Sequence, residues 1–171
     1  FHPVQAPRPL PKKTFLVVFD FDGVMTDNLV WVDASGHEYV ASYRSYSLGI
    51  HALQRSGVEV IVISTETDRA VTARCRKIGV PLIQDALDKA AILANYLDEK
   101  QIDARQVVYC GNDLNDLPCF PIVGCAVVPA DAQTEVIRAA DLVLNRPGGY
   151  GAVRELCELI LRRNAASKSN D

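Results

Sequence analysis

The chain has 171 residues, of which 49% are hydrophobic and 23% charged, and its formal net charge is −3. This length suits one α/β domain with its own core and is too short for two domains of ordinary size. The slightly acidic balance gives no reason to expect nucleic acid as a partner. No apolar run approaches the roughly 20 residues of a membrane-spanning helix, so we expect no membrane contact and a cytoplasmic protein.

Cysteines and chain ends set further limits. The five cysteines form no CxxC pair and fall mostly in apolar segments, which predicts reduced core residues rather than a zinc site. Residues 1–13 contain four prolines, which is typical of an extended linker to another domain or of a disordered tail. We therefore expect one domain over residues 14–164, followed by a disordered tail over residues 165–171.

The predicted elements begin with the apolar run from Phe15 to Phe19, which is typical of a buried parallel strand. Residues 28–42 contain two β-rich runs around an Asp-Ala-Ser-Gly turn, and this pattern predicts a hairpin. Strands and helices then alternate to the end. We expect strands at 58–64, 80–83, 107–110, 124–128 and 142–144, and helices from about 47, over 68–78 and 85–97, from about 132, and over 153–161. The alternation predicts an α/β fold, Rossmann-like and doubly wound, with a mainly parallel sheet.

Polar side chains follow several of these strands. They comprise Asp20 and Asp22, then Ser64 and Thr65, then residues 111–116, with Lys89 on the helix before the last group. Because the carboxyl ends of parallel strands meet at one crevice, these groups could surround one phosphate. Two carboxylates one residue apart suit a hard cation such as Mg²⁺.

Each residue also has an ordinary structural interpretation. Asp22 could begin a turn, Ser64 and Asp116 could cap helices, and Lys89 could be a solvated helix residue. It is their order along the chain that favours a catalytic site.

That order resembles the four motifs of the haloacid dehalogenase superfamily of phosphohydrolases, here DFDGVMT, VIS, Lys89 and GNDLND. The resemblance implies that Asp20 is the nucleophile and forms an aspartyl-phosphate. Asp22 would be the general acid and base, and its backbone carbonyl would bind Mg²⁺. Ser64 would donate a hydrogen bond to the phosphoryl group, and Lys89 would neutralise the charge between that group and Asp20.

One motif departs from the family pattern. Asn112 stands where the family usually has a metal-binding aspartate. An amide oxygen still ligates Mg²⁺ but brings no charge, so Asp113 or Asp116 would make up the deficit directly or through water. The implied metal site therefore comprises Asp20, Asp22, Asn112 and Asp113, with Asp116 behind them.

Many members of this family insert a cap domain after the first strand or before the third motif; neither insertion is present here, and only the predicted hairpin fills the first position. This layout resembles the branch that contains 3-deoxy-octulosonate 8-phosphate phosphatase, nonulosonate 9-phosphate phosphatases and the C-terminal domain of some CMP-sialate synthetases. The stretches DFDGVMTD, GNDLNDLPCF and RPGGYGAVRELCELIL carry the likeness. Members are typically tetramers whose C-terminal Gly-Gly segment reaches the adjacent active site. The resemblance thus implies a homotetramer and a possible fused cytidylyltransferase domain.

Within this branch the resemblance also implies substrate contacts. Gly148 and Gly149 would supply flexible backbone, although a tight loop before the last helix fits them equally well. Arg154 could meet a substrate carboxylate. Thr65 and Glu66 follow the second motif, and a glutamate there is typical of the nonulosonate type. Further basic residues of that type match Arg74 and Lys77, which could equally form an exposed helix face.

Two departures remove charge from the expected substrate rim. Ser45-Tyr46-Ser47 replaces an Arg-Asp-Gly sequence, and Tyr150 replaces an arginine between the C-terminal glycines. The acidic sugar would then be bound differently, or the substrate would be another phosphate ester.

Three functions remain open. The leading hypothesis is a Mg²⁺-dependent phosphatase acting on a 2-keto-3-deoxy sugar acid phosphate. The second is a non-catalytic oligomerisation domain of a CMP-sugar-acid synthetase, which loss of Asp20 would have favoured. The third is phosphoryl transfer between sugar positions, against which the missing cap argues.

Overall fold

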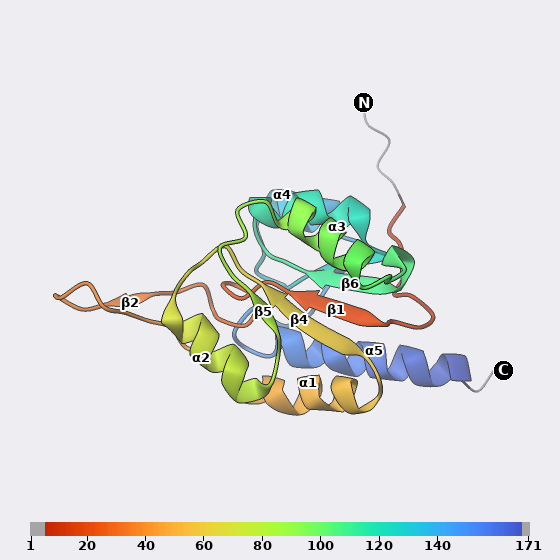
Figure 1. The fold of residues 1–171 in the computed structure, drawn as a ribbon, viewed down its shortest axis with the longest axis horizontal. Coiled ribbons are helices and arrows are strands. Elements are labelled where there is room, and N and C mark those ends of the chain that lie inside the picture. The colour runs from red at the N-terminus through yellow and green to blue at the C-terminus, as the bar shows by residue number, and fades with distance from the viewer. Residues whose placement is uncertain (1–5, 169–171) are drawn as a thin grey trace.

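A six-stranded parallel sheet lies at the centre of the protein, in the order β5-β4-β1-β6-β7-β8 (Figure 1). The computed structural model describes residues 6–168; residues 1–5, with Pro3, and 169–171 lie outside that range. The strands of this sheet are β1 (Leu16–Phe19), β4 (Glu59–Ile63), β5 (Leu82–Ile83), β6 (Val107–Cys110), β7 (Cys125–Val128) and β8 (Leu142–Val143). The helices are α1 (Tyr46–Arg55), α2 (Arg69–Ile78), α3 (Lys89–Glu99), α4 (Thr134–Ala139) and α5 (Ala152–Lys168), with 3₁₀ helices η1 (Ala104–Gln106) and η2 (Leu114–Ile122).

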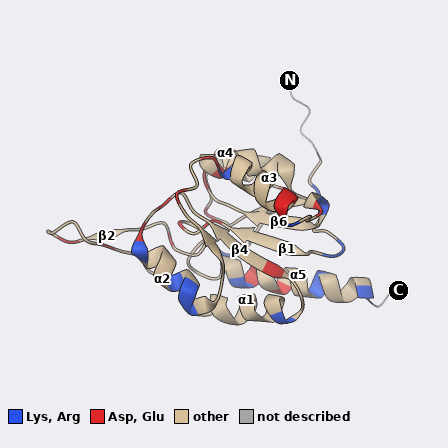
Figure 2. Ribbon diagram, in the orientation of Figure 1, with Lys and Arg blue, Asp and Glu red and all other residues tan. Residues whose placement is uncertain are grey.

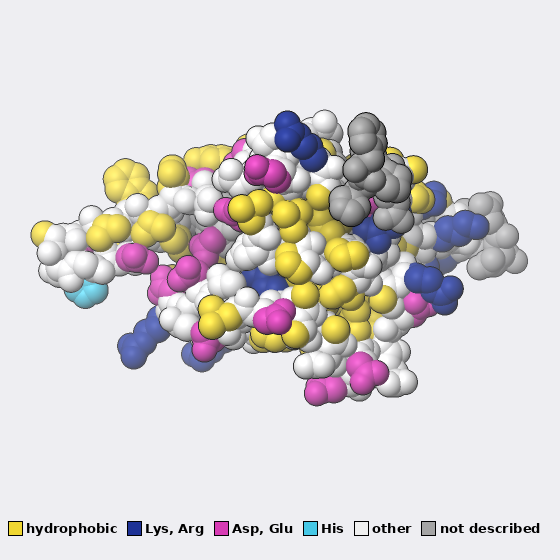
Figure 3. Space-filling view, turned by 90° about the horizontal axis from the view of Figure 1, so that it is seen from above, with side chains coloured by type: hydrophobic (Ala, Val, Ile, Leu, Met, Phe, Trp, Pro, Cys, Tyr) yellow, Lys and Arg dark blue, Asp and Glu magenta, His cyan; other side chains and the backbone are white. Residues whose placement is uncertain are grey.

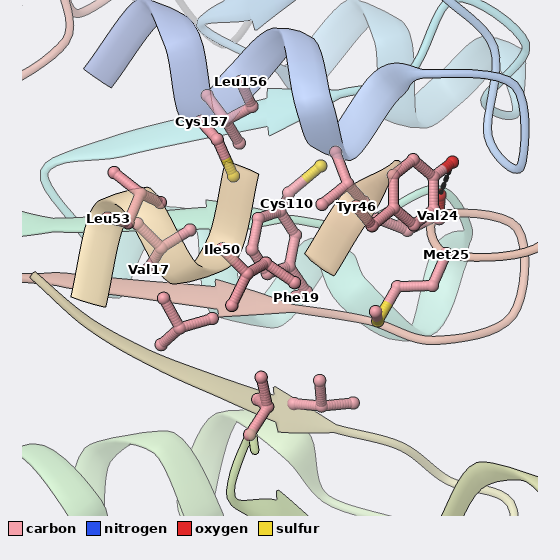
Figure 4. Packing of buried hydrophobic residues seen from close by; sticks show 14 of the residues in the cluster. Val17, Phe19, Val24, Met25, Tyr46, Ile50, Leu53, Cys110, Leu156 and Cys157 are labelled. Atoms are coloured by element: carbon pink, nitrogen blue, oxygen red, sulfur yellow. Dashed lines mark hydrogen bonds between the residues drawn. The ribbon is translucent and has the colours of Figure 1, made fainter. Parts of the chain in front are cut away.

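Helices cover both faces of this sheet, so the predicted doubly wound α/β fold is confirmed (Figure 1). Side chains alternate along a strand, which sends Val17 and Phe19 into one core and Val18 into the other. The first core includes residues of α1, α2 and α5, and Figure 4 shows Phe19 beside Ile50 of α1. The second core includes residues of α3, α4 and η2. Burial on both faces explains why the strands are continuous apolar runs.

The predicted hairpin is a separate two-stranded antiparallel sheet of β2 (Trp31–Val32) and β3 (Glu38–Tyr39). Asp33 stabilises its turn, since Asp33 Oδ1 accepts hydrogen bonds from the backbone N–H of Ser35 and of His37. The hairpin projects from the domain at the left of Figure 1. The described residues contain no further domain that could act as a cap.

Three elements differ from the sequence prediction. Helix α3 begins at Lys89 and not at Asp85, because Asp85 has a φ of 54° and the Asp88 side chain caps the helix. The 3₁₀ helix η2 was not expected; its two prolines, Pro118 and Pro121, disfavour a regular α-helix. Helix α5 runs to Lys168, so residues 165–168 are helical and the expected disordered tail is wrong for them.

The proline-rich segment lies against the domain over its described part. The Arg8 guanidinium pairs with Asp141 at 2.7 Å and donates hydrogen bonds to the carbonyls of Phe120 and Val123. Burial would raise the pKa of Asp141, but the hydrogen bonds from Arg8 outweigh it and hold that pKa below its ordinary value. Residues 6–13 are thus anchored, and their role as a linker stays a prediction.

Two further expectations concern composition. All five cysteines are free and buried, so the prediction of reduced core residues is confirmed. Between residues 6 and 168, no helix combines the length and apolar character needed to cross a bilayer.

Candidate active site

The candidate site lies where β1 and its two neighbours end. Strand β1 pairs with β4 on one side and with β6 on the other. Asp20 follows β1, Ser64 follows β4 and Asn112 follows β6 after one residue. The strand order reverses beside β1, where doubly wound sheets open a ligand crevice.

A buried cluster of three charged side chains forms the base of the site. The Lys89 ammonium lies 2.9 Å from Asp20 Oδ1 and 2.8 Å from Asp116 Oδ1. Asp20 is 6% exposed, Lys89 2% and Asp116 0%. The interpretation of Lys89 as a solvated helix residue is therefore wrong. A lysine in the first turn of a helix is disfavoured by the helix dipole, and here the two carboxylates stabilise it.

The electrostatics of this cluster follow from its burial. Desolvation and the nearby Asp116 carboxylate raise the pKa of Asp20 to about 7, although Lys89 opposes the shift. For Lys89, desolvation would lower the pKa, but Asp20 and Asp116 outweigh it and raise the pKa above its ordinary value. Lys89 therefore stays charged, whereas Asp20 gains or loses a proton near neutrality.

The Asn112 amide faces two oxygens, Asp20 Oδ2 at 3.0 Å and the Asp22 carbonyl at 2.9 Å. With its nitrogen on this side the amide donates to both. With its oxygen on this side, three oxygens converge. In octahedral magnesium, ligand oxygens about 2.1 Å from the ion lie about 3.0 Å from each other, so this spacing fits Mg²⁺.

The donor set contains three of the four residues that the resemblance implied for the metal. It comprises a carboxylate, a backbone carbonyl and an amide oxygen, which are ligands of hard cations. No group of three His, Cys, Asp or Glu side chains within residues 6–168 is arranged around a metal position. The structure brings Asn112, and not Asp113, beside Asp20 and Asp22; the Asp113 side chain accepts a hydrogen bond from the Leu114 backbone N–H.

Asp116 is held from several directions. Its Oδ2 accepts hydrogen bonds from the backbone N–H of Asn112 and of Asp113, while its Oδ1 accepts from Lys89 and from the Tyr109 hydroxyl. It also belongs to a capping box with Asp113 at the start of η2. A Cβ at Gly111 would overlap the Asp116 side chain, which explains the glycine in this motif. Asp116 supports Lys89 and the loop, as expected of a residue behind the metal ligands.

Above the cluster lies a pocket of about 370 Å³. Its lining is largely polar and consists of Asp20, Asp22, Asn28, Thr65, Glu66, Asn112, Asp113, Leu114 and Asn115. Burial raises the pKa of Asp22, with Glu66 and Asp68 adding to the effect. A carboxyl whose pKa is raised holds its proton more readily than an exposed one, which suits a general acid.

The residues expected to bind substrate are only partly in this pocket. Thr65 and Glu66 line it. Ser64 is buried, and its Oγ accepts a hydrogen bond from the Glu66 backbone N–H. It does not cap α2, because Asp68 does.

The three basic residues that were expected to bind substrate contact other parts of the chain or solvent. Arg74 donates a hydrogen bond to Ser42 Oγ at the base of the hairpin, and Lys77 is exposed on α2, where Figure 2 shows a run of basic residues. Arg154 pairs with Glu158 on its own helix at 2.8 Å. None of these three side chains is among the described residues that line the pocket.

The C-terminal glycine segment packs against its own chain. Gly149 donates a backbone hydrogen bond to the Val24 carbonyl, and a Cβ at Gly148 would overlap the Gly23 carbonyl oxygen. The Tyr46 hydroxyl joins the same contact, since it donates a hydrogen bond to the Val24 carbonyl (Figure 4). It also accepts a hydrogen bond from the Gly151 N–H. This is the tight loop considered from the sequence, and it braces the loop that follows Asp22.

Several residues of the site were not among the individual residues to which the sequence assigned a role. Asn28, Leu114 and Asn115 line the pocket, and Tyr109 contacts Asp116 beneath it. Asn28 has a φ of 66°, which an asparagine tolerates better than most residues. The signal for Leu114 and Asn115 was present, because both lie inside the GNDLND motif.

Known proteins resemble this chain in sequence and in fold. Residues 40–153 match the family model described as haloacid dehalogenase-like hydrolase. The 3-deoxy-D-manno-octulosonate 8-phosphate phosphatase of Salmonella typhi is 36% identical over 147 residues, which are 85% of this chain and 78% of that enzyme. The N-acylneuraminate cytidylyltransferase of Oncorhynchus mykiss is 34% identical over 163 residues. That match covers 93% of this chain, which spans only 38% of the length of the cytidylyltransferase.

A solved structure extends the comparison to the fold. The 3-deoxy-D-manno-octulosonate 8-phosphate phosphatase from Moraxella catarrhalis was determined with magnesium, phosphate and the KDO molecule bound. It is 29% identical to this chain, with a TM-score of 0.86 over 93% of this chain and 92% of that one. The chain belongs to the haloacid dehalogenase-like hydrolases, within the phosphatase group that includes the octulosonate 8-phosphate phosphatases and is related to the cytidylyltransferase C-terminal region.

Proposed function

We propose that this protein hydrolyses the phosphate ester of a 2-keto-3-deoxy sugar acid, of the nonulosonate 9-phosphate or octulosonate 8-phosphate type. One observation carries the proposal. Asp20, Lys89 and Asp116 form a buried cluster, and oxygens of Asp20 and Asp22 converge with the Asn112 amide above it. The relatives named above support the substrate type, since one acts on an octulosonate 8-phosphate by its name.

The reaction begins at Asp20. A carboxylate oxygen of Asp20 attacks phosphorus, a new P–O bond forms, and the bond to the sugar oxygen breaks. Asp22 gives its proton to the departing sugar oxygen. Asp22 then takes a proton from water, whose oxygen attacks phosphorus and breaks the bond to Asp20. The raised pKa of Asp22 favours the protonated form that the first half of the cycle needs.

Lys89 and Ser64 act on the phosphoryl oxygens. The Lys89 ammonium carries three protons, and two are directed at Asp20 and Asp116. The third is available to the charge that develops on the phosphoryl group. The Ser64 hydroxyl can donate to the same group, because its contact with Glu66 uses only its acceptor capacity.

The residues present suit Mg²⁺, which would be held by the Asp20 carboxylate, the Asp22 carbonyl and the Asn112 amide oxygen. When bound, the ion supplies positive charge that the buried cluster lacks, because two carboxylates there face one ammonium. Asp113 lies at the pocket wall and adds a carboxylate nearby.

We further propose that the working form is an oligomer, most simply a homotetramer, in which a neighbour completes the pocket. Within residues 6–168 the pocket lining has carboxylates and no basic side chain, so it offers nothing to pair with the carboxylate of a sugar acid. The projecting hairpin carries apolar side chains into solvent (Figure 3). One of them is Trp31, which is 74% exposed. A second copy that packs there would bury them.

The substrate is tested by phosphate release from a panel of sugar phosphates, with and without Mg²⁺. We expect the highest kcat/KM on a 2-keto-3-deoxy sugar acid phosphate and loss of activity in a chelator. Asp20→Asn should abolish turnover while the protein stays folded, whereas Asp27→Asn, outside the pocket, should retain it. Unchanged phosphate release by Asp20→Asn would refute the nucleophile. Preference for a neutral sugar phosphate would refute the sugar acid.

The alternative is a non-catalytic oligomerisation domain of a cytidylyltransferase. The match to the longer Oncorhynchus mykiss enzyme favours it. Wild-type protein that releases phosphate from no member of the panel, yet forms a stable oligomer, would establish this alternative.

A further inference from the structure

Tyr109 lies beneath the site, and the mechanism above does not use it. The residue belongs to β6 and is completely buried. Its hydroxyl donates a hydrogen bond of 2.6 Å to Asp116 Oδ1. The same oxygen accepts the 2.8 Å hydrogen bond from Lys89. One oxygen atom therefore connects the tyrosine to the lysine that faces the nucleophile.

The hydroxyl itself is held in a fixed direction. The Tyr109 ring packs on Phe120 of η2, with ring centroids 6.2 Å apart and planes tilted by 59°. Tyr109 belongs to strand β6, whereas the acceptor of its hydroxyl, Asp116, and its packing partner, Phe120, both belong to η2. Burial and the Asp116 carboxylate raise the pKa of Tyr109 well above its ordinary value, so the hydroxyl remains a donor.

The Lys89 geometry depends on where Asp116 Oδ1 lies. Two of the three ammonium protons are directed at carboxylate oxygens, and their directions set the direction of the third. The backbone N–H groups of Asn112 and Asp113 hold Asp116 Oδ2, whereas the partners of Oδ1 are the Lys89 ammonium and the Tyr109 hydroxyl. Tyr109 therefore supplies the contact that holds Oδ1 in place independently of Lys89.

We propose that Tyr109 is a positioning residue, which fixes Asp116 Oδ1 and thereby aims the Lys89 ammonium at Asp20 and at the transferring phosphoryl group. The inference rests on the proposed phosphatase mechanism. A purely structural tyrosine would stabilise the fold without changing the rate of the folded enzyme. A positioning tyrosine changes the rate, because Lys89 acts most strongly in the transition state.

The test compares Tyr109→Phe with the wild type and with Tyr96→Phe, which removes a hydroxyl from a partly buried tyrosine on α3 outside this cluster. Hydrolysis of p-nitrophenyl phosphate is measured with Mg²⁺ at a temperature where thermal melts show every variant folded. Since a hydrogen bond to a charged group is lost, we expect kcat to fall about tenfold in Tyr109→Phe. We expect KM to stay within about twofold, because ground-state binding changes little. Tyr96→Phe should match the wild type.

The inhibition constants of two phosphate analogues give a second measurement, which a loss of fold stability alone does not change. Orthovanadate resembles the transition state of phosphoryl transfer, so its inhibition should weaken by about the same factor as kcat/KM. Inhibition by inorganic phosphate should stay the same in Tyr109→Phe. Equal weakening of both inhibitors would contradict a transition-state effect.

A second variant tests whether the tyrosine acts through Asp116. In Asp116→Asn the buried charge is gone, and adding Tyr109→Phe should change the residual kcat by less than about twofold if the tyrosine acts through Asp116. Effects that multiply in the double variant would overturn the inference, as would a Tyr109→Phe protein with lower thermal stability and wild-type kcat. A wild-type protein without phosphatase activity would overturn the proposed function and this inference together.

Discussion

The buried cluster at residue 20 has more negative than positive charge. Asp20 and Asp116 share a single ammonium group, and all three side chains are almost inaccessible to water. Burial and the Asp116 carboxylate disfavour the ionised form of Asp20 and raise its pKa to about 7. The folded protein can therefore reduce the excess negative charge by binding a proton. A divalent cation would also neutralise this negative charge, so protons and Mg²⁺ should compete for the Asp20 carboxylate.

This competition predicts a pH-dependent stability. The pKa of Asp20 is about 7 in the folded protein, against an ordinary value of 3.8, so between these values the folded state binds more protons than the unfolded state. The contribution of Asp20 therefore lowers the free energy of unfolding as the pH rises through this window. Mg²⁺ binds the ionised carboxylate, so the gain in Tm that it produces should increase over the same window.

Thermal melts between pH 5 and pH 8, with and without Mg²⁺, check this prediction. Asp20→Asn has no titrating carboxyl at this position, so without metal it should melt above the wild type at pH 8 and close to it at pH 5. Its Tm should also respond much less to Mg²⁺. A wild type whose stability relative to Asp20→Asn grows with rising pH in the absence of metal would contradict the sign of the shift.

Much of the site could be predicted from the sequence because its residues follow strands. Asp20, Asn112 and Asp116 lie in short motifs at strand ends, and a parallel sheet brings such ends together. The role of Tyr109 could not be predicted, because in the sequence it is one more residue of an apolar strand. Arg154 was expected at the substrate from resemblance, yet in this chain its guanidinium pairs with Glu158. Side-chain direction of this kind depends on tertiary neighbours.

At the scale of elements, the loop before α5 braces the loop after Asp22. Gly148 lies so close to the Gly23 carbonyl oxygen that no side chain fits between them. We expect Gly148→Ala to displace the loop that carries Asp22, and to lower kcat about tenfold or more, since small misplacements of catalytic groups are costly. We also expect it to lower the free energy of unfolding by about 2 kcal/mol, as overpacking does.

The matched control is Gly57→Ala. Gly57 has a φ of 91°, but a Cβ there would meet no atom within 4 Å. The control should therefore lose stability through backbone strain while its kcat stays at the wild-type level. Steady-state kinetics and urea unfolding of both variants separate the two effects. Equal kcat values for Gly148→Ala and the wild type would show that the brace does not position Asp22.

For the helices and strands, the type of each element was easier to predict than the residues at which it begins and ends. The strands are apolar runs bounded by polar residues, and the helices between them have capping residues such as Asp68 and Asp88. The start of α3 was placed four residues too early because the backbone at Asp85 turns with a positive φ, which its sequence does not reveal. No element was predicted over η2, whose two prolines disfavour an α-helix, although consecutive 3₁₀ turns accommodate them.

At the scale of the whole molecule, the pocket and the hairpin are the features that bear on assembly. The pocket lies at the carboxyl edge of the sheet beside the base of the hairpin, to which Asn28 belongs. The hairpin strands are only two residues long, and their side chains are exposed. Such a small sheet gains little stability by itself. Its exposed apolar side chains and the absence of a basic group in the described pocket lining are the two observations that support the proposed neighbouring subunit.

The hairpin therefore offers the most direct test of assembly. Trp31 is 74% exposed and pairs across the hairpin with Tyr39, so Trp31→Glu should leave the core intact while placing a charge in the proposed interface. We expect this variant to elute as a smaller species in size-exclusion chromatography with light scattering, with thermal stability of the monomer retained. Since a neighbour is proposed to complete the pocket, its kcat/KM on a sugar acid phosphate should fall at least tenfold, while hydrolysis of p-nitrophenyl phosphate falls less. Val143→Glu, an exposed valine on the edge strand β8, should change neither property. A Trp31→Glu monomer with full activity on the sugar acid phosphate would show that one subunit holds the complete site.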